Sequence, residues 1–332
     1  MANSAIEILG IGNAIVDVIA QADDAFLARH GMSKAAMALV DEAQANTLYA
    51  AMGPGIEASG GSAANTIAGA ASFGARTAFI GKVRDDELGG IFAHDLRALG
   101  VRFETPAATH GPSTARCLIL VTHDAQRTMN TYLGACTELT PADIDETLVA
   151  AADITYLEGY LFDPPLAKEA FRKAATIARG AGRRVALTLS DSFCVHRYRD
   201  EFRALIAEHV DILLANEAEI GALYETSDIE AAARDLATQV RLAAITRGPA
   251  GSMLLRGDER VDVAAAPIDE VVDTTGAGDL YASGLLFGLA RGLPLAECGR
   301  LGSLAAREII SHFGARPLLS LAELAEAERQ DA

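Results

Sequence analysis

The chain has 332 residues, half of them hydrophobic, which is ample apolar material for a large core. Its formal net charge of −17 argues against nucleic acids and anionic membranes as partners, because such binding relies on Lys and Arg neutralising phosphates. No apolar run approaches the roughly 20 residues that span a bilayer, and residues 1–5 carry no basic signal region. Four scattered cysteines show neither metal-ligand nor disulfide-framework spacing: Cys117, Cys136, Cys194 and Cys298. We therefore expect a cytoplasmic protein from a reducing compartment.

Short apolar segments of β type alternate with helical patterns along most of the chain. Helices are expected at 63–73, 88–99 and 165–179, and strands at 77–81, 154–157, 185–189 and 212–215. Fully apolar strands separated by helices indicate parallel strands covered on both faces. The sequence therefore predicts an α/β fold with a doubly wound, mostly parallel sheet flanked by helices.

Two regions break this alternation, one between Asp17 and Gly60 and the other from Ala115 to Leu133. The first contains a strand-like segment at 36–40, and the second contains two strands around a turn at 123–125. Strands outside βα units can form a small separate sheet that covers a site. We expect one domain over 1–332, with a small β lid built from about 15–58 and 102–135.

The most specific motif is the segment Asp273-Thr-Thr-Gly-Ala-Gly-Asp279, which precedes an apolar helix at 280–290. The backbone N–H groups of Gly276, Ala277 and Gly278 can approach an anion closely, and they lie where the helix dipole favours negative charge. Asp279 would then lie beside a bound phosphate and could accept a proton from an attacking hydroxyl. The alternative is an ordinary turn in which Thr274 or Thr275 caps the helix. Two glycines at a helix start are costly for packing alone, so function is favoured.

A second glycine-rich turn, from Gly60 to Asn65, also opens a helix. The pair Gly60 and Gly61 would let a ligand lie against the backbone, and Asn65 offers both a donor and an acceptor. The alternative is a tight strand-to-helix turn capped by Ser62. Taken alone, the segment does not separate the two interpretations.

Near the start of the chain, Asn13 and Asp17 interrupt an apolar strand. The segment is not a dinucleotide fingerprint, because Ile15 occupies the third glycine position. A carboxylate on an apolar strand could bind the vicinal hydroxyls of a ligand, or it could lie at a solvated strand end.

Asn216 and Glu219 follow the strand that ends near Ala215. Their spacing is typical of a helix capping box. The carboxyl end of a parallel strand is also where ligands bind, so Glu219 could hold a magnesium ion through water.

Together these motifs resemble those of the ribokinase-like (PfkB) kinases, most closely the adenosine kinases, over nearly the whole chain. Segment 273–279 matches the second family signature, in which the last aspartate, here Asp279, is the catalytic base and the preceding amides form an anion hole. Segments 60–65 and 81–89 resemble the first signature. Asn216 and Glu219 match an Asn-X-X-Glu motif for magnesium and phosphate. The resemblance implies nucleotide contacts from Asn216, Thr246, Gly248 and Thr275.

Several residues resemble the adenosine kinases in particular. Asn13 and Asp17 match residues that hold the ribose, and Phe193 matches a phenylalanine that stacks on the purine. Tyr160 or Leu161 falls near a second aromatic contact, Met129 on an apolar contact to the base, and Arg127 on a lid arginine that meets the phosphates. The alternatives are core packing for Phe193 and Met129 and a solvated hairpin for Arg127.

Two departures concern the acceptor. Leu161 replaces an expected aromatic residue, and Thr275 stands where eukaryotic adenosine kinases usually carry asparagine; threonine there is common in sugar kinases.

The resemblance implies transfer of a phosphoryl group from ATP to the 5′-hydroxyl of adenosine, with Mg²⁺ as the cofactor and K⁺ as a second candidate cofactor. Two alternatives stay open: a sugar kinase of the same family, acting on ribose, fructose or 2-keto-3-deoxygluconate, and a nucleoside-binding regulator without catalysis. The expected partners are ATP and a nucleoside or sugar, and the protein is expected to be a monomer or a homodimer.

Overall fold

The computed structural model describes residues 6–124 and 126–330. Within that part of the chain, nine strands form the larger sheet. Seven of these strands pair in parallel, and two further strands extend one edge of the sheet by antiparallel pairing. The spatial order is β14 (Glu259–Val263), β13 (Ser252–Arg256), β12 (Leu242–Thr246), β11 (Ile212–Asn216), β10 (Arg184–Thr188), β9 (Ile154–Glu158), β1 (Ile8–Ile11), β5 (Thr77–Ile80) and β6 (Arg102–Phe103).

Helices cover both faces of this sheet, and a separate cluster of buried side chains fills each interface. One face carries α5 (Glu146–Ala151), α6 (Pro165–Gly180), α7 (Ser192–His209), α8 (Glu217–Tyr224) and α9 (Ile229–Gln239). The other face carries α3 (Ser62–Ser72), α4 (Glu87–Ala98), α10 (Ala277–Ala290) and α11 (Leu295–Ile310), with α12 (Leu321–Gln330) packed outside them. Short 3-10 turns lie at Gly134–Glu138, Pro141–Asp143, Gly159–Phe162 and Gly248–Ala250. The predicted doubly wound α/β fold is confirmed.

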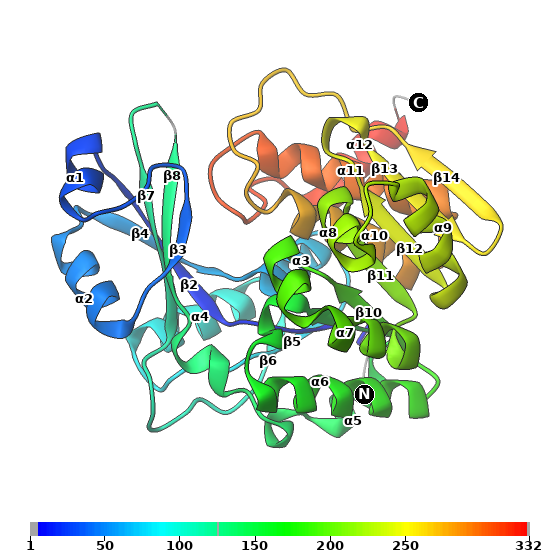
Figure 1. The fold of residues 1–332 in the computed structure, drawn as a ribbon, viewed down its shortest axis with the longest axis horizontal. Coiled ribbons are helices and arrows are strands. Elements are labelled where there is room, and N and C mark those ends of the chain that lie inside the picture. Colours follow the sequence, from blue (N-terminus) through cyan, green and yellow to red (C-terminus); the bar gives the residue numbers. More distant parts are fainter. Residues whose placement is uncertain (1–5, 125, 331–332) are drawn as a thin grey trace.

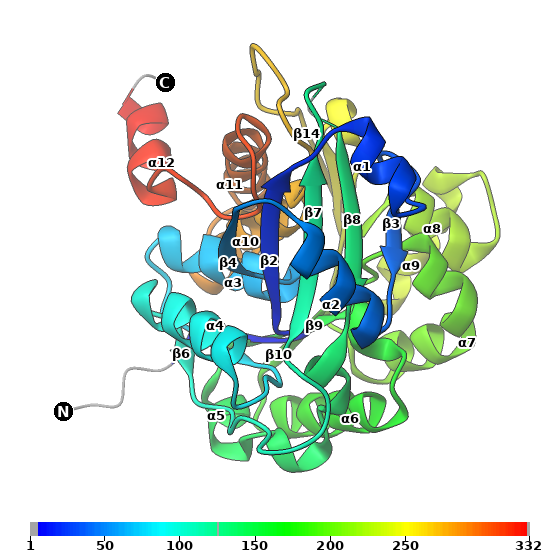
Figure 2. The ribbon, with the colours of Figure 1, turned by 90° about the vertical axis from the view of Figure 1, so that its left-hand side faces the viewer.

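A second, five-stranded sheet stands apart from the large one, at the left of Figure 1 and toward the viewer in Figure 2. Its order is β3 (Met37–Leu39), β8 (Arg127–Tyr132), β7 (Ala115–Val121), β2 (Ile15–Gln21) and β4 (Gly55–Gly60). Helices α1 (Asp24–Arg29) and α2 (Glu42–Ala51) cover one face through Val18, Leu27, Ala45, Leu48, Leu118 and Leu120. Because side chains alternate across a strand, the residues between these positions face the other way, toward the large sheet.

Both predicted lid segments contribute to this small sheet, although β6 pairs with β5 in the large one. The turn predicted at 123–125 lies between β7 and β8, and Ala125 is outside the described residues. All four cysteines are buried free thiols. In the described ranges, no helix is both long and apolar enough to cross a membrane.

The order of the large sheet positions the site. The chain runs from β1 to β5 on one side and from β9 to β10 on the other, so the order reverses between β9 and β1. Ligands of open α/β sheets bind at the carboxyl ends of the strands beside such a reversal. Asn13 follows β1, and Glu158 ends β9. These two residues therefore mark the expected position of a ligand.

Candidate active site

A cleft of about 470 Å³ lies between the small sheet and the carboxyl ends of the large one. This volume is within the range typical of small-molecule sites. The cleft is lined by predicted site residues from segments far apart in the sequence: Asn13, Asp17, Gly61, Ser62, Asn65, Met129, Phe193, Asn216, Glu219, Thr246, Thr275, Gly276, Ala277, Gly278 and Asp279. The fold therefore brings most of the predicted residues together.

Asp279 lies in the first turn of α10, behind a loop that ends at Gly276. Gly276 is the N-cap residue and has a φ of 78°, a conformation that glycine adopts without strain. No side chain caps this helix, so the capping role considered for Thr274 or Thr275 is wrong. Thr275 instead donates to Asp273 through its Oγ1, at 2.8 Å. The exposed helix start leaves backbone N–H groups for an anion, although Ala277 N–H already donates to Thr274 O at 3.2 Å.

The carboxylate of Asp279 is held by the start of α3. Ser62 Oγ donates to Asp279 Oδ1 at 2.6 Å, and Asn65 Nδ2 donates to Oδ2 at 2.9 Å. Burial raises the pKa of Asp279 to about 6, opposed by these two hydrogen bonds and by the charge of Arg316. Ser62 therefore does not cap α3, as the alternative interpretation held; its hydroxyl connects two segments of the cleft.

Asp17 faces the same region from β2. A Cβ at Gly60 would overlap the Asp17 carboxylate, so Gly60 supports this close approach without lining the cleft itself. Burial raises the pKa of Asp17 to about 6, while Arg316 and Arg127 oppose that shift and Asp279 adds to it. Asp17 is therefore part of a charged cluster and not a solvated strand end.

The sequence did not single out Glu158, which is 1% exposed and lines the cleft at the end of β9. Its Oε1 accepts from Asn13 Nδ2 at 2.7 Å, and its Oε2 accepts from the Ala63 N–H at 2.8 Å. Burial raises the pKa of Glu158 to about 7. The sequence offered one signal for Glu158: it is a charged residue at the end of an apolar strand, directly before a glycine.

Asn216 and Glu219 form the capping box expected from their spacing. Asn216 N donates to Glu219 Oε2 at 3.0 Å, and Asn216 Nδ2 donates to Oε1 at 2.7 Å. Glu219 is 5% exposed, and burial raises its pKa to about 7. In 6–124 and 126–330, no group of three acidic, Cys or His side chains could cage a metal. Asn216 and Glu219 both line the cleft, so the structure brings this predicted pair to the site.

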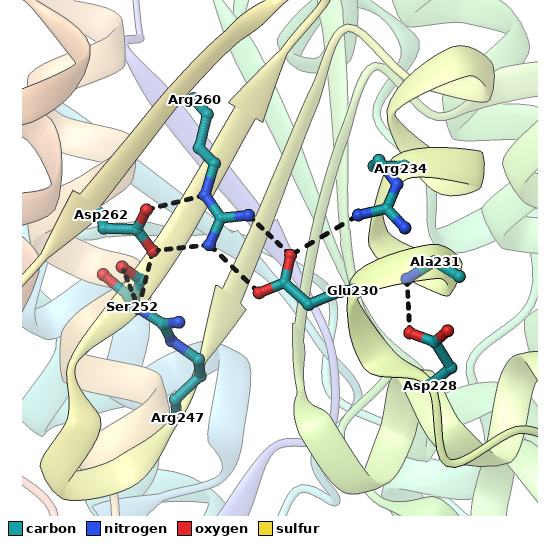
Figure 3. A network of polar contacts seen from close by, with 8 residues as sticks. All are labelled: Asp228, Glu230, Ala231, Arg234, Arg247, Ser252, Arg260 and Asp262. Atoms are coloured by element: carbon teal, nitrogen blue, oxygen red, sulfur yellow. Dashed lines mark hydrogen bonds and ion pairs between the residues drawn. The ribbon is translucent and has the colours of Figure 1, made fainter.

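At the end of β12, only Thr246 of the segment 246–248 lines the cleft. Arg247 does not line the cleft, and its Nη2 donates to Asp262 Oδ1 on β14 at 2.8 Å. Figure 3 shows how Arg260 extends this network to Glu230. Gly248 lies in the following 3-10 turn and is not part of the cleft wall, contrary to expectation.

The apolar side of the cleft differs from the prediction at one residue. Leu161 is 1% exposed and packs in the core beneath α6 and α7, so it is not a ligand contact. Its neighbour Tyr160 lines the cleft. Phe193 is 74% exposed at the start of α7, which excludes core packing as its role, and Met129 lines the cleft from β8.

Arg127 does not line the cleft. Its side chain is buried in an ion pair, so the alternative of a solvated position is also wrong. Its Nη1 lies 2.8 Å from Asp273 Oδ2, and both side chains are more than nine-tenths buried. Its guanidinium also lies over the Phe313 ring, 5.2 Å from the centroid. In this conformation Arg127 links the small sheet to the loop that precedes α10.

The sequence and the fold are similar to those of known kinases. Residues 55–321 match the pfkB family of carbohydrate kinases. The structure is similar to that of an adenosine kinase from Sinorhizobium meliloti, at 55% identity and a TM-score of 0.90, with 99% of this chain and all of that chain covered. It is also similar to a probable sugar kinase protein from Rhizobium etli, at 50% identity and a TM-score of 0.91 over 98% and 99% of the two chains. Adenosine kinase from Saccharomyces cerevisiae is 26% identical over 326 residues, covering 92% and 94% of the chains.

The chain belongs to the pfkB family of kinases, as the motifs predicted. Its close structural neighbours include both adenosine and sugar kinases, and family membership supports an ATP-dependent kinase that uses ATP with a divalent metal, generally Mg²⁺.

Proposed function

We propose that this protein is an adenosine kinase that transfers the γ-phosphoryl group of ATP to the 5′-hydroxyl of adenosine, forming AMP in purine salvage. One observation carries the proposal: the same cleft combines an acidic cluster with a wide apolar wall. The wall comprises Ile15, Met37, Leu39, Ile119, Met129, Leu133, Tyr160 and Phe193. A free sugar offers no flat apolar face, whereas a purine does.

Asp279 is proposed as the general base. It accepts the proton of the 5′-hydroxyl as the new oxygen–phosphorus bond forms and the bond to the departing ADP breaks. Ser62 and Asn65 hold its carboxylate in place. The N–H groups of Gly276 and Gly278 stabilise charge on the transferred group, and that of Ala277 joins them once it is released from Thr274 O. Mg²⁺, when bound, neutralises phosphate charge, with Asn216 and Glu219 holding it through water.

Ribose is proposed to bind through Asn13, Asp17, Gly61 and Asn65. Because Asn13 Nδ2 donates to Glu158, its Oδ1 is left to accept from a ligand hydroxyl. Asn65 Oδ1 is buried and has no hydrogen-bond partner among the described residues, so it too can accept from a hydroxyl. A ligand with several adjacent hydroxyl donors would satisfy both oxygens and the Asp17 carboxylate.

Two observations favour a sugar kinase as the second candidate. By resemblance, Thr275 is the residue type expected of a sugar kinase, and a structure 50% identical to this one is that of a probable sugar kinase. The acidic cluster alone would serve either acceptor, so the apolar wall is the feature that separates the two.

The test compares kcat/KM for adenosine, ribose, fructose and 2-keto-3-deoxygluconate at saturating MgATP, using ADP formation as the readout. Adenosine is expected to be the preferred acceptor. Phe193→Ala should lower its kcat/KM by about fivefold or more, because stacking of a base on an aromatic ring contributes roughly 1–3 kcal/mol. Leu166→Ala is the matched control, since Leu166 is half exposed but outside the cleft.

The sugar-kinase alternative would replace this proposal if a free sugar had a higher kcat/KM than adenosine. The same conclusion would follow if Phe193→Ala left kcat/KM for adenosine unchanged. Binding of adenosine without ADP formation from any acceptor would indicate a non-catalytic regulator.

A further inference from the structure

Arg316 belongs to none of the motifs and does not line the cleft, yet it lies directly behind the acceptor side. It is partly buried in the segment 311–320, between α11 and α12. Its guanidinium donates three hydrogen bonds to one stretch of chain: Nε to Ser59 O at 2.9 Å, Nη2 to Ser59 Oγ at 3.1 Å, and Nη1 to Ala64 O. A planar guanidinium fixes several acceptors at once in a way that a lysine cannot.

These acceptors flank the turn that holds Asp279. Ser59 is the residue of β4 just before its last residue, Gly60. Ala64 lies between Ser62 and Asn65, whose side chains donate to the Asp279 carboxylate. The Ser59 N–H is fixed from the opposite side by Asp95 Oδ2 of α4, at 2.8 Å. The position of the two donors to Asp279 therefore depends on a C-terminal residue that is distant in sequence.

The charge of Arg316 acts on three carboxylates from three elements: Asp17 of β2, Asp279 of α10 and Asp95 of α4. Burial lowers the pKa of Arg316 to about 10, and the three carboxylates oppose that shift, so the side chain stays charged at neutral pH.

We propose that Arg316 is a positioning residue of the phosphoryl-transfer site: its guanidinium fixes the turn between β4 and α3, and it supplies a positive charge that Asp17 and Asp279 share. This inference rests on the proposed function, in which Asp279 is the base and Asp17 binds the acceptor. Arg316 itself is not placed in contact with ATP or the acceptor.

The pH dependence follows from the groups around the two carboxylates. Asp279 receives hydrogen bonds from Ser62 and Asn65 and the field of Arg316, and Tyr156, Glu158 and Tyr160 face it from the β9 side. Asp17 is affected by Arg316, Arg127 and Asp279. Both carboxylates have a pKa raised to about 6 and must be ionised to work, so kcat/KM should fall as the pH drops through this value. Without the charge of Arg316, this decline should begin at a higher pH.

The experiment compares Arg316→Gln and Arg316→Lys with the wild type. It measures kcat/KM for adenosine from about pH 5 to about pH 9, ATP affinity by calorimetry, and Tm. Arg316→Gln should move the acidic decline upward by about one pH unit, because a neighbouring opposite charge lowers a carboxyl pKa by roughly 1–3 units. Arg316→Lys keeps the charge but loses the planar set of donors. Its acidic decline should stay near that of the wild type, while its KM for adenosine rises several-fold.

Arg300→Gln is the matched control. Arg300 pairs with Glu297 and Glu328 at 2.8 and 2.7 Å between α11 and α12, away from the cleft. Its loss should lower Tm without moving the pH profile. The same shift in Arg300→Gln as in Arg316→Gln would overturn the inference.

The inference would also be overturned if both Arg316 variants had the same pH profile and the same KM for adenosine as the wild type. Should Arg316→Gln fail to fold, Arg316→Lys decides alone, and an unchanged KM for adenosine overturns the role. The activity of Asp279→Asn separates a failure of this inference from a failure of the proposed function. If that variant is inactive, a negative result concerns Arg316 alone; if it is active, the base assignment fails and this inference fails with it.

Discussion

The two halves of the cleft are built in different ways. In the half proposed to bind the acceptor, here called the acceptor half, hydrogen bonds join residues far apart in the chain: Ser62 and Asp279 are 217 positions apart, and Asn13 and Glu158 are 145 apart. In the half proposed to bind ATP, here called the nucleotide half, Asn216 and Glu219 are three positions apart and form their contacts within one turn of helix. The acceptor half therefore exists only in the folded protein, whereas the core of the nucleotide half is a local motif.

The halves also differ in what surrounds their acidic groups. Asp17, Asp279 and Glu158 share one neighbourhood, in which Arg316 supplies a positive charge to the first two. Glu219 is held by its own helix start and is affected by one other carboxylate, Asp191. We therefore expect substitutions in the acceptor half to have the larger and more strongly coupled effects, and those at Glu219 to have the smaller ones.

The largest effect is expected from Asp279→Asn. Loss of a general base lowers kcat by roughly 10²–10⁴-fold, while ATP affinity should stay unchanged. Steady-state kinetics and calorimetric ATP titration check this. Asp145→Asn, at the N-cap of α5 outside the cleft, is the control and should behave as wild type. Retention of more than about a tenth of wild-type kcat would remove Asp279 from the role of base.

Asp17→Ala should come next. A hydrogen bond to a charged group contributes roughly 1.5–3 kcal/mol, so kcat/KM for the acceptor should fall by about tenfold or more. The KM for ATP should change little, because Asp17 lies on the small-sheet side of the cleft. A change confined to the ATP parameters would contradict this division between the two halves.

The smallest effect is expected from Glu219→Gln. Glutamine can close a capping box, but it replaces one of the two oxygens that accept from Asn216 N and Asn216 Nδ2 with an NH₂ donor, so Tm should fall slightly. The magnesium concentration needed for half-maximal rate should rise, because the charge that orients a metal-bound water is lost.

Magnesium titration of the rate and thermal unfolding measure the two parts of this last prediction separately. Glu217→Gln, in the same helix turn, is the control for the change of charge. A lower Tm with an unchanged magnesium requirement would make Glu219 purely a cap.

The sequence by itself determined the features that depend on local spacing. The alternation of apolar strands and helices specified the doubly wound fold, because a strand covered by helices on both faces of the sheet must be apolar at every position. The capping box at Asn216 was visible because its contacts lie within three positions. The glycine loops at the starts of α3 and α10 were visible because Gly61 and Gly276 adopt positive φ angles that favour glycine. The motifs also specified the family.

Only the tertiary structure decided which side chains meet. It placed Tyr160 in the cleft and Leu161 in the core, because the 3-10 turn after β9 directs adjacent residues to opposite sides. It brought Arg127 to Asp273, and Arg316 to the turn beneath Asp279. Such pairs leave no periodic signal in the sequence, since their separation along the chain is set by the order of strands in the two sheets. Glu158 was recognisable as a charged strand end, but its role emerged only when the parallel pairing of β9 with β1 brought it to Asn13.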